Sequence, residues 1–301
     1  DFKKNNLHLM GYSSSFKKKV TLEYLKKHLY TDKGNKKAIP YVTSYYKKNW
    51  GFCLSYNQLK KLKNGNYRVI INTKLIKKSL TYGEIYLKGR SKKEIFLSTN
   101  ICHPSLANNE VSGPVVTAFI AKWLSGLKNK KYSYRIIFIP ETIGALVYLK
   151  SNLLTLKKNI IGGYNVVCIG DNRGYSFLPT RNGNTLSDKI AKLIFLENKI
   201  RYKKYSWLER GSDERQYCSP GIDLPIASIM RSKYGEYKEY HNSLDNLKNV
   251  VTQKGLFGGY NIIKQVIKKF EKLYLPKSNI LGEPFLQKRK LYQKNYYDQD
   301  T

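Results

Sequence analysis

The sequence lacks any long apolar run, and it is poor in cysteine. None of its apolar stretches approaches the roughly 20 residues that a membrane-spanning helix needs, and the best runs, 135–140 and 165–170, have the length of strands. We therefore expect no membrane span. Only four cysteines occur, which are Cys53, Cys102, Cys168 and Cys218. Their spacing shows no pairing typical of disulfide frameworks or zinc fingers, so we expect reduced core thiols and a cytoplasmic protein.

Acidic residues are also scarce, because 21 Asp and Glu face 55 Lys and Arg and leave a formal net charge of +34. Such an excess of positive charge is typical of nucleic-acid-binding proteins. However, 45 of the basic residues are Lys and only ten are Arg, and they are spread along the chain. Proteins that read bases or grip phosphates favour the bidentate fork of Arg. We therefore expect no specific nucleic-acid binding, and we keep it as a third hypothesis that salt-dependent binding to DNA would test.

Hydrophobic residues make up 41% of the chain, enough for a buried core. From residue 94 onward, short apolar segments alternate with segments of helical periodicity. Strands are predicted at 94–99, 134–140, 165–170 and 224–230, and helices at 113–127, 144–154, 185–198 and 251–273. This alternation predicts an α/β fold whose mostly parallel sheet is covered by helices on both faces.

The first hundred residues have a different texture. Apolar positions near helical spacing predict a helix over 15–30, and residues 39–98 then read as short strands separated by turn signals. We expect a small inserted β-rich domain at 37–91, within an α/β domain formed by 1–36 and 92–284. The insert would cap a cleft or mediate self-association into an oligomer. Residues 285–301 read as a tail or linker toward a missing segment, and because residue 1 is Asp, we expect a segment before it.

Potential metal ligands follow the predicted strands. His103, Glu141 and Asp171 each come directly after one of them, and His241 precedes the last helix. Ligands of parallel sheets bind at the carboxyl ends of the strands, so these side chains are expected at one edge of the sheet. Imidazole and carboxylate groups are the usual ligands of catalytic zinc, with positions left open for water. The pattern therefore predicts a metal site.

Five ordered segments resemble the co-catalytic zinc aminopeptidase fold. They are STNICHPSLANNEVSGPVV, IPETIG, GDNRGYSFLP, ERGSDERQYCSPGIDLP and YHNSLDNL. The closer similarity is to the aminopeptidase-like proteins found with bacterial polysaccharide-biosynthesis genes, whose inserted β domain is matched by AIPYVTSYYKKNWGFCLS and SLTYGE. The winged helix that usually ends that group has no counterpart in this sequence, although EPFLQKRKLY resembles the lead into it.

The resemblance implies the roles of four residues. His103 and Asp171 match ligands of a first zinc, and His241 matches the late histidine of a second. Glu141 matches the glutamate that acts as general base. It would take a proton from a metal-activated water and return it to the leaving amine.

Two positions depart from that pattern. Asn109, beside Glu110, stands where the family has its bridging Asp, and Thr142 stands where it has the second Glu of a pair. Two zinc ions about 3.5–4 Å apart need bridging anions. We therefore expect one zinc rather than two, held by His103 and Asp171 with Glu110 or Asn109. The general base could instead turn into the ligand shell, and the late histidine would then complete a different site.

The predicted activity is zinc-dependent hydrolysis of an amide bond, on a substrate linked to surface polysaccharide. Six of the ten Arg lie within 171–231, and Arg forks suit carboxylates and phosphates. We therefore expect a small-molecule or peptide substrate, and an acidic one fits these Arg better than a neutral peptide. The predicted substrate-binding residues are Arg173, Arg181, Arg210, Asp213, Arg215 and Arg231. Loss of two family ligands also allows an alternative, a catalytically inactive binding or scaffold module of the same fold.

Overall fold

The computed structural model describes residues 5–274 and 278–291. The chain divides into two compact units, Asp1–Glu271 and Lys272–Thr301. In the described part of the second unit, a short 3-10 helix, η4, covers Gln287–Arg289. The first unit contains the sheets and the candidate site.

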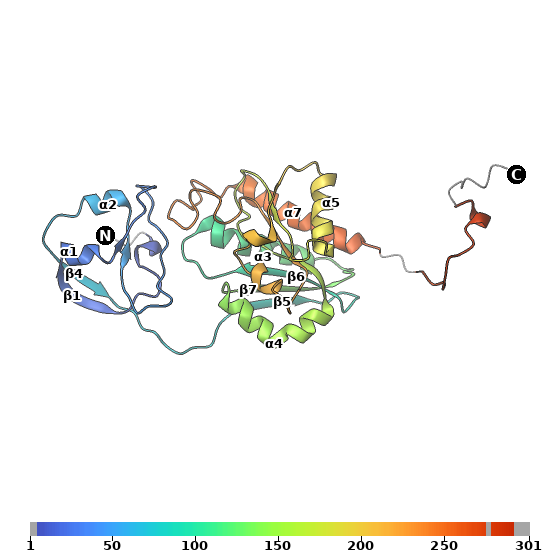
Figure 1. Ribbon diagram of the computed structural model, residues 1–301, viewed down its shortest axis with the longest axis horizontal. Coiled ribbons are helices and arrows are strands. Elements are labelled where there is room, and N and C mark those ends of the chain that lie inside the picture. The colour runs from blue at the N-terminus through green and yellow to red at the C-terminus, as the bar shows by residue number, and fades with distance from the viewer. Residues whose placement is uncertain (1–4, 275–277, 292–301) are drawn as a thin grey trace. The chain divides into compact units, whose positions relative to one another are not determined.

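A seven-stranded sheet, in the order β10-β9-β11-β8-β6-β7-β5, organises the first unit (Figure 1). Its strands are β5 (Gly83–Leu87), β6 (Glu94–Asn100), β7 (Ser133–Ile139), β8 (Ile160–Asn165), β9 (Ser176–Leu178), β10 (Lys203–Lys204) and β11 (Ile226–Met230). β7, β6, β8 and β11 are parallel neighbours, whereas β5 and β9 run antiparallel to the strands beside them, β7 and β11. The predicted fold class, a mostly parallel sheet in an α/β arrangement, is confirmed.

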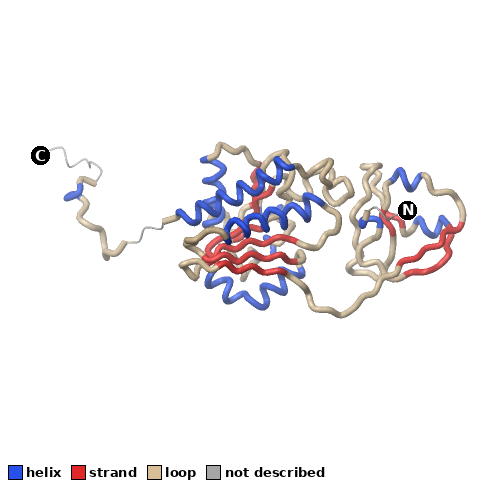
Figure 2. Tube along the Cα trace, turned by 180° about the vertical axis from the view of Figure 1, so that it is seen from behind, coloured by secondary structure: helices blue, strands red, loops and turns tan. Residues whose placement is uncertain are grey.

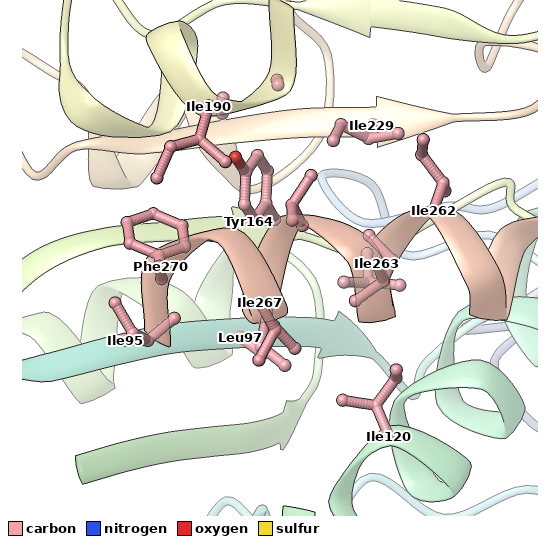
Figure 3. Packing of buried hydrophobic residues seen from close by; sticks show 14 of the residues in the cluster. Ile95, Leu97, Ile120, Tyr164, Ile190, Ile229, Ile262, Ile263, Ile267 and Phe270 are labelled. Carbon is pink, nitrogen blue, oxygen red and sulfur yellow. The ribbon is translucent and has the colours of Figure 1, made fainter. Parts of the chain in front are cut away.

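Helices cover both faces of this sheet (Figure 2). They are α3 (Ser112–Ser125), α5 (Leu186–Glu197) and α7 (Gln253–Lys272) on one face, and α4 (Ile143–Asn159) and α6 (Glu214–Tyr217) on the other. Apolar side chains of α7, such as Ile263, Ile267 and Phe270, recur at helical spacing and pack against Ile95 and Leu97 of β6 (Figure 3). Because both faces are covered, all seven residues of β6 are buried. No helix of 5–274 or 278–291 is long and apolar enough to cross a membrane.

The strand predicted at 165–170 lies earlier in the chain than expected. β8 covers 160–165, and the apolar residues after it are irregular, with Cys168 at a φ of 48°. The strand contains two glycines that sequence propensity penalises. A Cβ at Gly163 would lie 2.1 Å from the Phe96 carbonyl oxygen, so only glycine allows this strand to pack so closely against β6. The prediction was wrong here because close backbone packing overrode propensity.

The helix predicted over 15–30 is a strand followed by a short helix. β1 (Phe16–Thr21) pairs antiparallel with β4 (Asn66–Ile71), and Thr21 caps the five-residue helix α1 (Leu22–Lys26). Phe16 and Val20 pack against a small core around Trp50, which favours the strand. The other elements of residues 5–60 are η1 (Asn6–His8), β2 (Leu29–Tyr30), β3 (Phe52–Cys53) and α2 (Tyr56–Lys60).

The boundaries of the predicted insert differ from the strand pairing at both ends. β5 falls within 37–91 but belongs to the seven-stranded sheet, and β1 precedes residue 37 but pairs with β4. The division into domains otherwise stays a prediction.

Candidate active site

Neighbouring strands β6 and β7 bring the first two predicted site residues together. β6 ends at Asn100 and leads into Cys102 and His103, and β7 ends at Ile139, two residues before Glu141. The two strands are parallel, so both segments emerge at the carboxyl edge of the sheet. The structure therefore brings His103 and Glu141 into one group.

His103 is held from behind by Glu110. Glu110 lies in the π-helical turn η2 (Ala107–Val111), which Asp245 secures by accepting hydrogen bonds from the backbone N–H groups of Asn108 at 2.6 Å and Asn109 at 2.9 Å. From there Glu110 Oε2 lies 3.0 Å from His103 Nδ1. A carboxylate on one imidazole nitrogen fixes the tautomer and directs the other nitrogen toward a metal or substrate.

The two groups shift each other's protonation. Burial lowers the pKa of His103, but the hydrogen bond and charge of Glu110 outweigh burial and the net shift is upward. Burial raises the pKa of Glu110, but the hydrogen bond and charge of His103 outweigh it and leave the pKa below its usual value. Glu110 therefore stays ionised behind the ring.

Glu141 has one anchored oxygen and one that faces the histidine. Its Oε1 accepts hydrogen bonds from Ser212 Oγ at 2.8 Å and from Asn100 Nδ2 at 3.1 Å. Its Oε2 lies 3.8 Å from His103 Nε2, beyond hydrogen-bond distance. Burial raises the pKa of Glu141 against the opposing effect of the His103 charge. A carboxylate with a raised pKa is suited to accept a proton near neutral pH.

Cys102 is a site residue that the sequence analysis missed. Its Sγ lies 3.0 Å from His103 Nδ1 and accepts a hydrogen bond from the Glu141 backbone N–H at 3.4 Å. Cys102, His103 and Glu141 each offer a ligand atom within 4.8 Å of the others. Cys102 is exposed, unlike the other three cysteines, so the expectation of a core thiol was wrong for this residue. The signal was its position directly before His103 at a strand end.

Asp171, predicted as a metal ligand, lies in a different environment. Its Oδ1 accepts hydrogen bonds from Arg173 N at 2.9 Å and Ser232 Oγ at 3.0 Å. Its Oδ2 accepts from Ser232 N at 2.8 Å and Asn108 Nδ2 at 3.2 Å. The side chain is completely buried. Both oxygens thus hold protein donors, and Asp171 is not part of the Cys102, His103 and Glu141 group.

Two further predicted ligands leave buried polar atoms without hydrogen-bond partners in the described part of the chain. They are Asn109 Oδ1 and His241 Nε2. The His241 ring lies 5.3 Å from the His103 ring, and burial followed by the His103 charge lowers its pKa to about 4. A neutral imidazole is the form that binds metals. These atoms and the Cys102 group provide donor types that suit zinc.

Thr142, at a position where the resemblance implies an acidic residue, lies beside a guanidinium group. Thr142 has φ 62° and ψ −70°, a strained conformation. Its backbone N–H donates to Asp213 Oδ1 at 2.7 Å, and Arg215 donates to its hydroxyl. Burial, and then the charge of Glu141, raise the pKa of Asp213 well above its usual range. The flank of Glu141 therefore holds a fixed cation.

The other predicted substrate-binding arginines already have partners. Arg173 pairs with Glu239, Arg181 pairs with Asp223, Arg210 lies over the Trp207 ring of the short helix η3 (Trp207–Glu209), and Arg231 donates to the Asp171 carbonyl. Arg215 is the one that contacts the segment carrying Glu141.

Comparison with known proteins gives a family and a curated relative. Residues 19–272 match the model of a family described as a domain of unknown function, DUF4910. A protein of Clostridium acetobutylicum named as a polysaccharide biosynthesis protein with an aminopeptidase-like domain is 45% identical over 295 residues. The match covers 97% of this chain and 67% of the relative, so the chain spans about two thirds of that protein.

Solved structures agree on the fold. A crystal structure described as a peptidase from Clostridium acetobutylicum is 44% identical, with a TM-score of 0.87 over 96% of this chain and 68% of that one. A zinc aminopeptidase from Bacillus subtilis has a TM-score of 0.57 over 82% of this chain and 65% of its own length. At 12% identity, the second likeness shows the fold alone.

Proposed function

The chain belongs to the DUF4910 family of aminopeptidase-like proteins, and on that premise we propose that it is a zinc-dependent hydrolase of an amide bond. The observation that carries this proposal is the arrangement of His103 between two carboxylates. Glu110 fixes one ring nitrogen at 3.0 Å, and the other faces the free oxygen of Glu141 at 3.8 Å. A metal-binding imidazole and a base directed at one point are the minimum for metal-assisted hydrolysis.

Cys102 and His103 would hold the metal, with the unpartnered atoms of Asn109 and His241 as further donors. When bound, zinc polarises a carbonyl group and lowers the pKa of a coordinated water. A single zinc fits better than two, because neutral Thr142 and the cationic Arg215 beside it offer no anion to a second ion.

The protein's own residues manage the protons. Ser212 and Asn100 hold Glu141 Oε1, which leaves Oε2 to accept the proton of the attacking water. The same oxygen then returns that proton to the leaving amine. Arg215 supplies positive charge beside Glu141, where it would neutralise an anionic group of the substrate.

The proposed substrate is a small molecule or peptide linked to surface polysaccharide, and the proposed location is the cytoplasm. The name of the curated relative supports the first part. The second part is supported by the four cysteines, which are all free thiols, three buried and one exposed. We expect no specific nucleic-acid partner.

Zinc content and amide hydrolysis test the proposal. Elemental mass spectrometry on protein purified without chelator should find close to one zinc per chain, and a panel of aminoacyl and acyl-sugar amides should yield free amine. His103→Ala should lose both zinc and hydrolysis. Zinc retained in full by His103→Ala would contradict the ligand assignment.

Cobalt distinguishes the ligands. A cobalt-loaded protein with a thiolate ligand shows a near-ultraviolet charge-transfer band, which Cys102→Ser should abolish and Cys53→Ser should leave intact. A bound cobalt without that band would remove Cys102 from the ligand set and keep the rest.

A catalytically silent scaffold is the second candidate function. The observation that favours it is Asp171, whose two oxygens are fully used by four protein donors. A protein that takes up no zinc when zinc is offered, yet is stably folded, would favour the scaffold.

A further inference from the structure

A segment from the N-terminal part of the chain reaches the candidate active site. The Tyr41 backbone N–H donates to the His241 carbonyl at 2.7 Å, and Pro40 forms an antiparallel bridge with Asn242. The Tyr41 ring lies 5.0 Å from the His103 ring and 5.2 Å from the His241 ring. Tyr41 therefore contacts both histidines, although His103 lies about 60 residues and His241 about 200 residues after it in the sequence.

Two more tyrosines lie beside each other on loops joined to this segment. Tyr12 and Tyr45 have ring centroids 4.7 Å apart, and each is about half exposed, at 56% and 53%. Backbone hydrogen bonds from Gly11 to Val42 at 2.9 Å and from Ser44 to Gly11 at 3.0 Å hold their loops together. We call Tyr12, Tyr41 and Tyr45 the tyrosine platform.

The tyrosine platform borders the reactive group. Burial raises the pKa of Tyr12, and Tyr45 and Cys102 raise it further. Burial is the main cause that raises the pKa of Tyr41, and Tyr45, Cys102 and Glu110 raise it further. Both phenols therefore lie within electrostatic reach of Cys102.

The loop holds Tyr12 in an unfavourable conformation. Its φ is 64°, which is rare for a bulky side chain and costs energy. The ring nevertheless stays half exposed beside Tyr45, so burial does not offset the cost. Strained residues persist where the surrounding structure fixes them, and they cluster at binding sites.

We propose that the tyrosine platform binds a sugar ring of the substrate, so that the amide on that sugar lies at His103 and Glu141. The proposal rests on the proposed hydrolase function and names its substrate class as an acylated amino sugar or a sugar–amide conjugate. Aromatic faces stack on the C–H face of a pyranose, and phenol groups bond its hydroxyls.

Saturation-transfer NMR on the full chain tests this with the methyl glycoside of N-acetylglucosamine as probe. We expect saturation transfer to the protons of the sugar ring. Tyr45→Ala and Tyr12→Ala should each weaken the affinity for the probe about fivefold. Tyr24→Ala is the matched control, because Tyr24 is 42% exposed in the same part of the chain but contacts His28 and Trp50 instead. Its affinity should equal that of the unmodified protein.

The outcomes separate this inference from the proposed function. The sugar-binding proposal alone would be overturned if Tyr45→Ala left sugar binding unchanged. It would also be overturned if protein that contains zinc and cleaves amides bound no sugar. Absence of zinc and hydrolysis, with sugar binding still dependent on Tyr12 and Tyr45, would overturn the hydrolase and keep the sugar subsite.

Discussion

Glu141 follows β7 and Asp171 comes after β8, the two strands that flank β6 in the sheet, yet their surroundings differ. Glu141 uses one oxygen for Ser212 and Asn100 and turns the other toward His103 at 3.8 Å. Asp171 uses both oxygens for donors from the protein. A carboxylate with a free oxygen can accept a proton or bind a metal ion, whereas one whose oxygens are all used by hydrogen-bond donors serves as a structural brace.

The difference explains how the carboxyl edge of one sheet can hold both a reactive group and the residues that keep it in position. The brace formed by Asp171 holds Asn108 in η2, and η2 carries Glu110, which sets the position of His103. The reactive group is thus positioned by a network that does no chemistry itself. Four predictions test this separation.

Replacing the free carboxylate should have the largest effect. We expect Glu141→Gln to slow amide hydrolysis by about 10²–10⁴-fold, because the general base is lost. Zinc content should stay unchanged, which elemental mass spectrometry checks. In the unmodified enzyme, the rate should fall with decreasing pH through the pKa of Glu141, which burial raises from its usual value. Loss of zinc in Glu141→Gln would make Glu141 a ligand instead.

Replacing the saturated carboxylate should act on stability. Asp171→Ala leaves four donors without an acceptor, and we expect it to lower the free energy of unfolding by about 3 kcal/mol in a urea titration. Zinc bound per folded chain should be retained. The matched control is Asp223→Ala, whose partly exposed ion pair with Arg181 should contribute less than about 1 kcal/mol. A stable Asp171→Ala variant that lacks zinc would show that Asp171 is a ligand after all.

The sequence was a good guide to the sheet and a partial guide to the site. The alternation of apolar and amphipathic segments predicted the α/β class, and the strand ends predicted that His103 and Glu141 would meet. It could not show that Asp171 is saturated, because the donors Ser232 and Asn108 come from distant segments. Long-range hydrogen bonds leave no local pattern.

Two other features were hidden for the same reason. Cys102 could be judged reactive or inert only from its surroundings, since a cysteine in a strand-like segment is usually a core residue. Tyr41 reaches the histidines through a bridge to residue 242, a pairing that no periodicity indicates. Tertiary contacts, rather than residue type, decided these roles.

Weakening the support behind the histidine should have a smaller effect. Glu110→Gln keeps the shape of the side chain but removes its charge from His103 Nδ1, and such outer partners typically change metal affinity by about 10–100-fold. Competition with a chelator of known affinity measures the change. Glu209→Gln in the exposed helix η3 changes a carboxylate that accepts a hydrogen bond from the Ser206 N–H instead, and it should bind zinc as the unmodified protein does. Equal affinity in Glu110→Gln would mean that the ring is positioned without the carboxylate.

The smallest effect should come from His241, and it should appear as a pH dependence of stability in the metal-free protein. The folded pKa is lowered to about 4 by burial and the His103 charge, whereas an unfolded histidine titrates near 6.5. Between these values the unfolded chain binds the extra proton, so stability should fall as the pH falls from 6.5 to 4. We expect His241→Gln to remove about 1 kcal/mol of that change, because a partly buried ring is screened by solvent. Urea titrations of both proteins at pH 7 and pH 4.5 measure the difference. An identical pH dependence in the variant would mean that His241 titrates alike in the folded and unfolded chains, and that burial and the His103 charge do not lower its pKa.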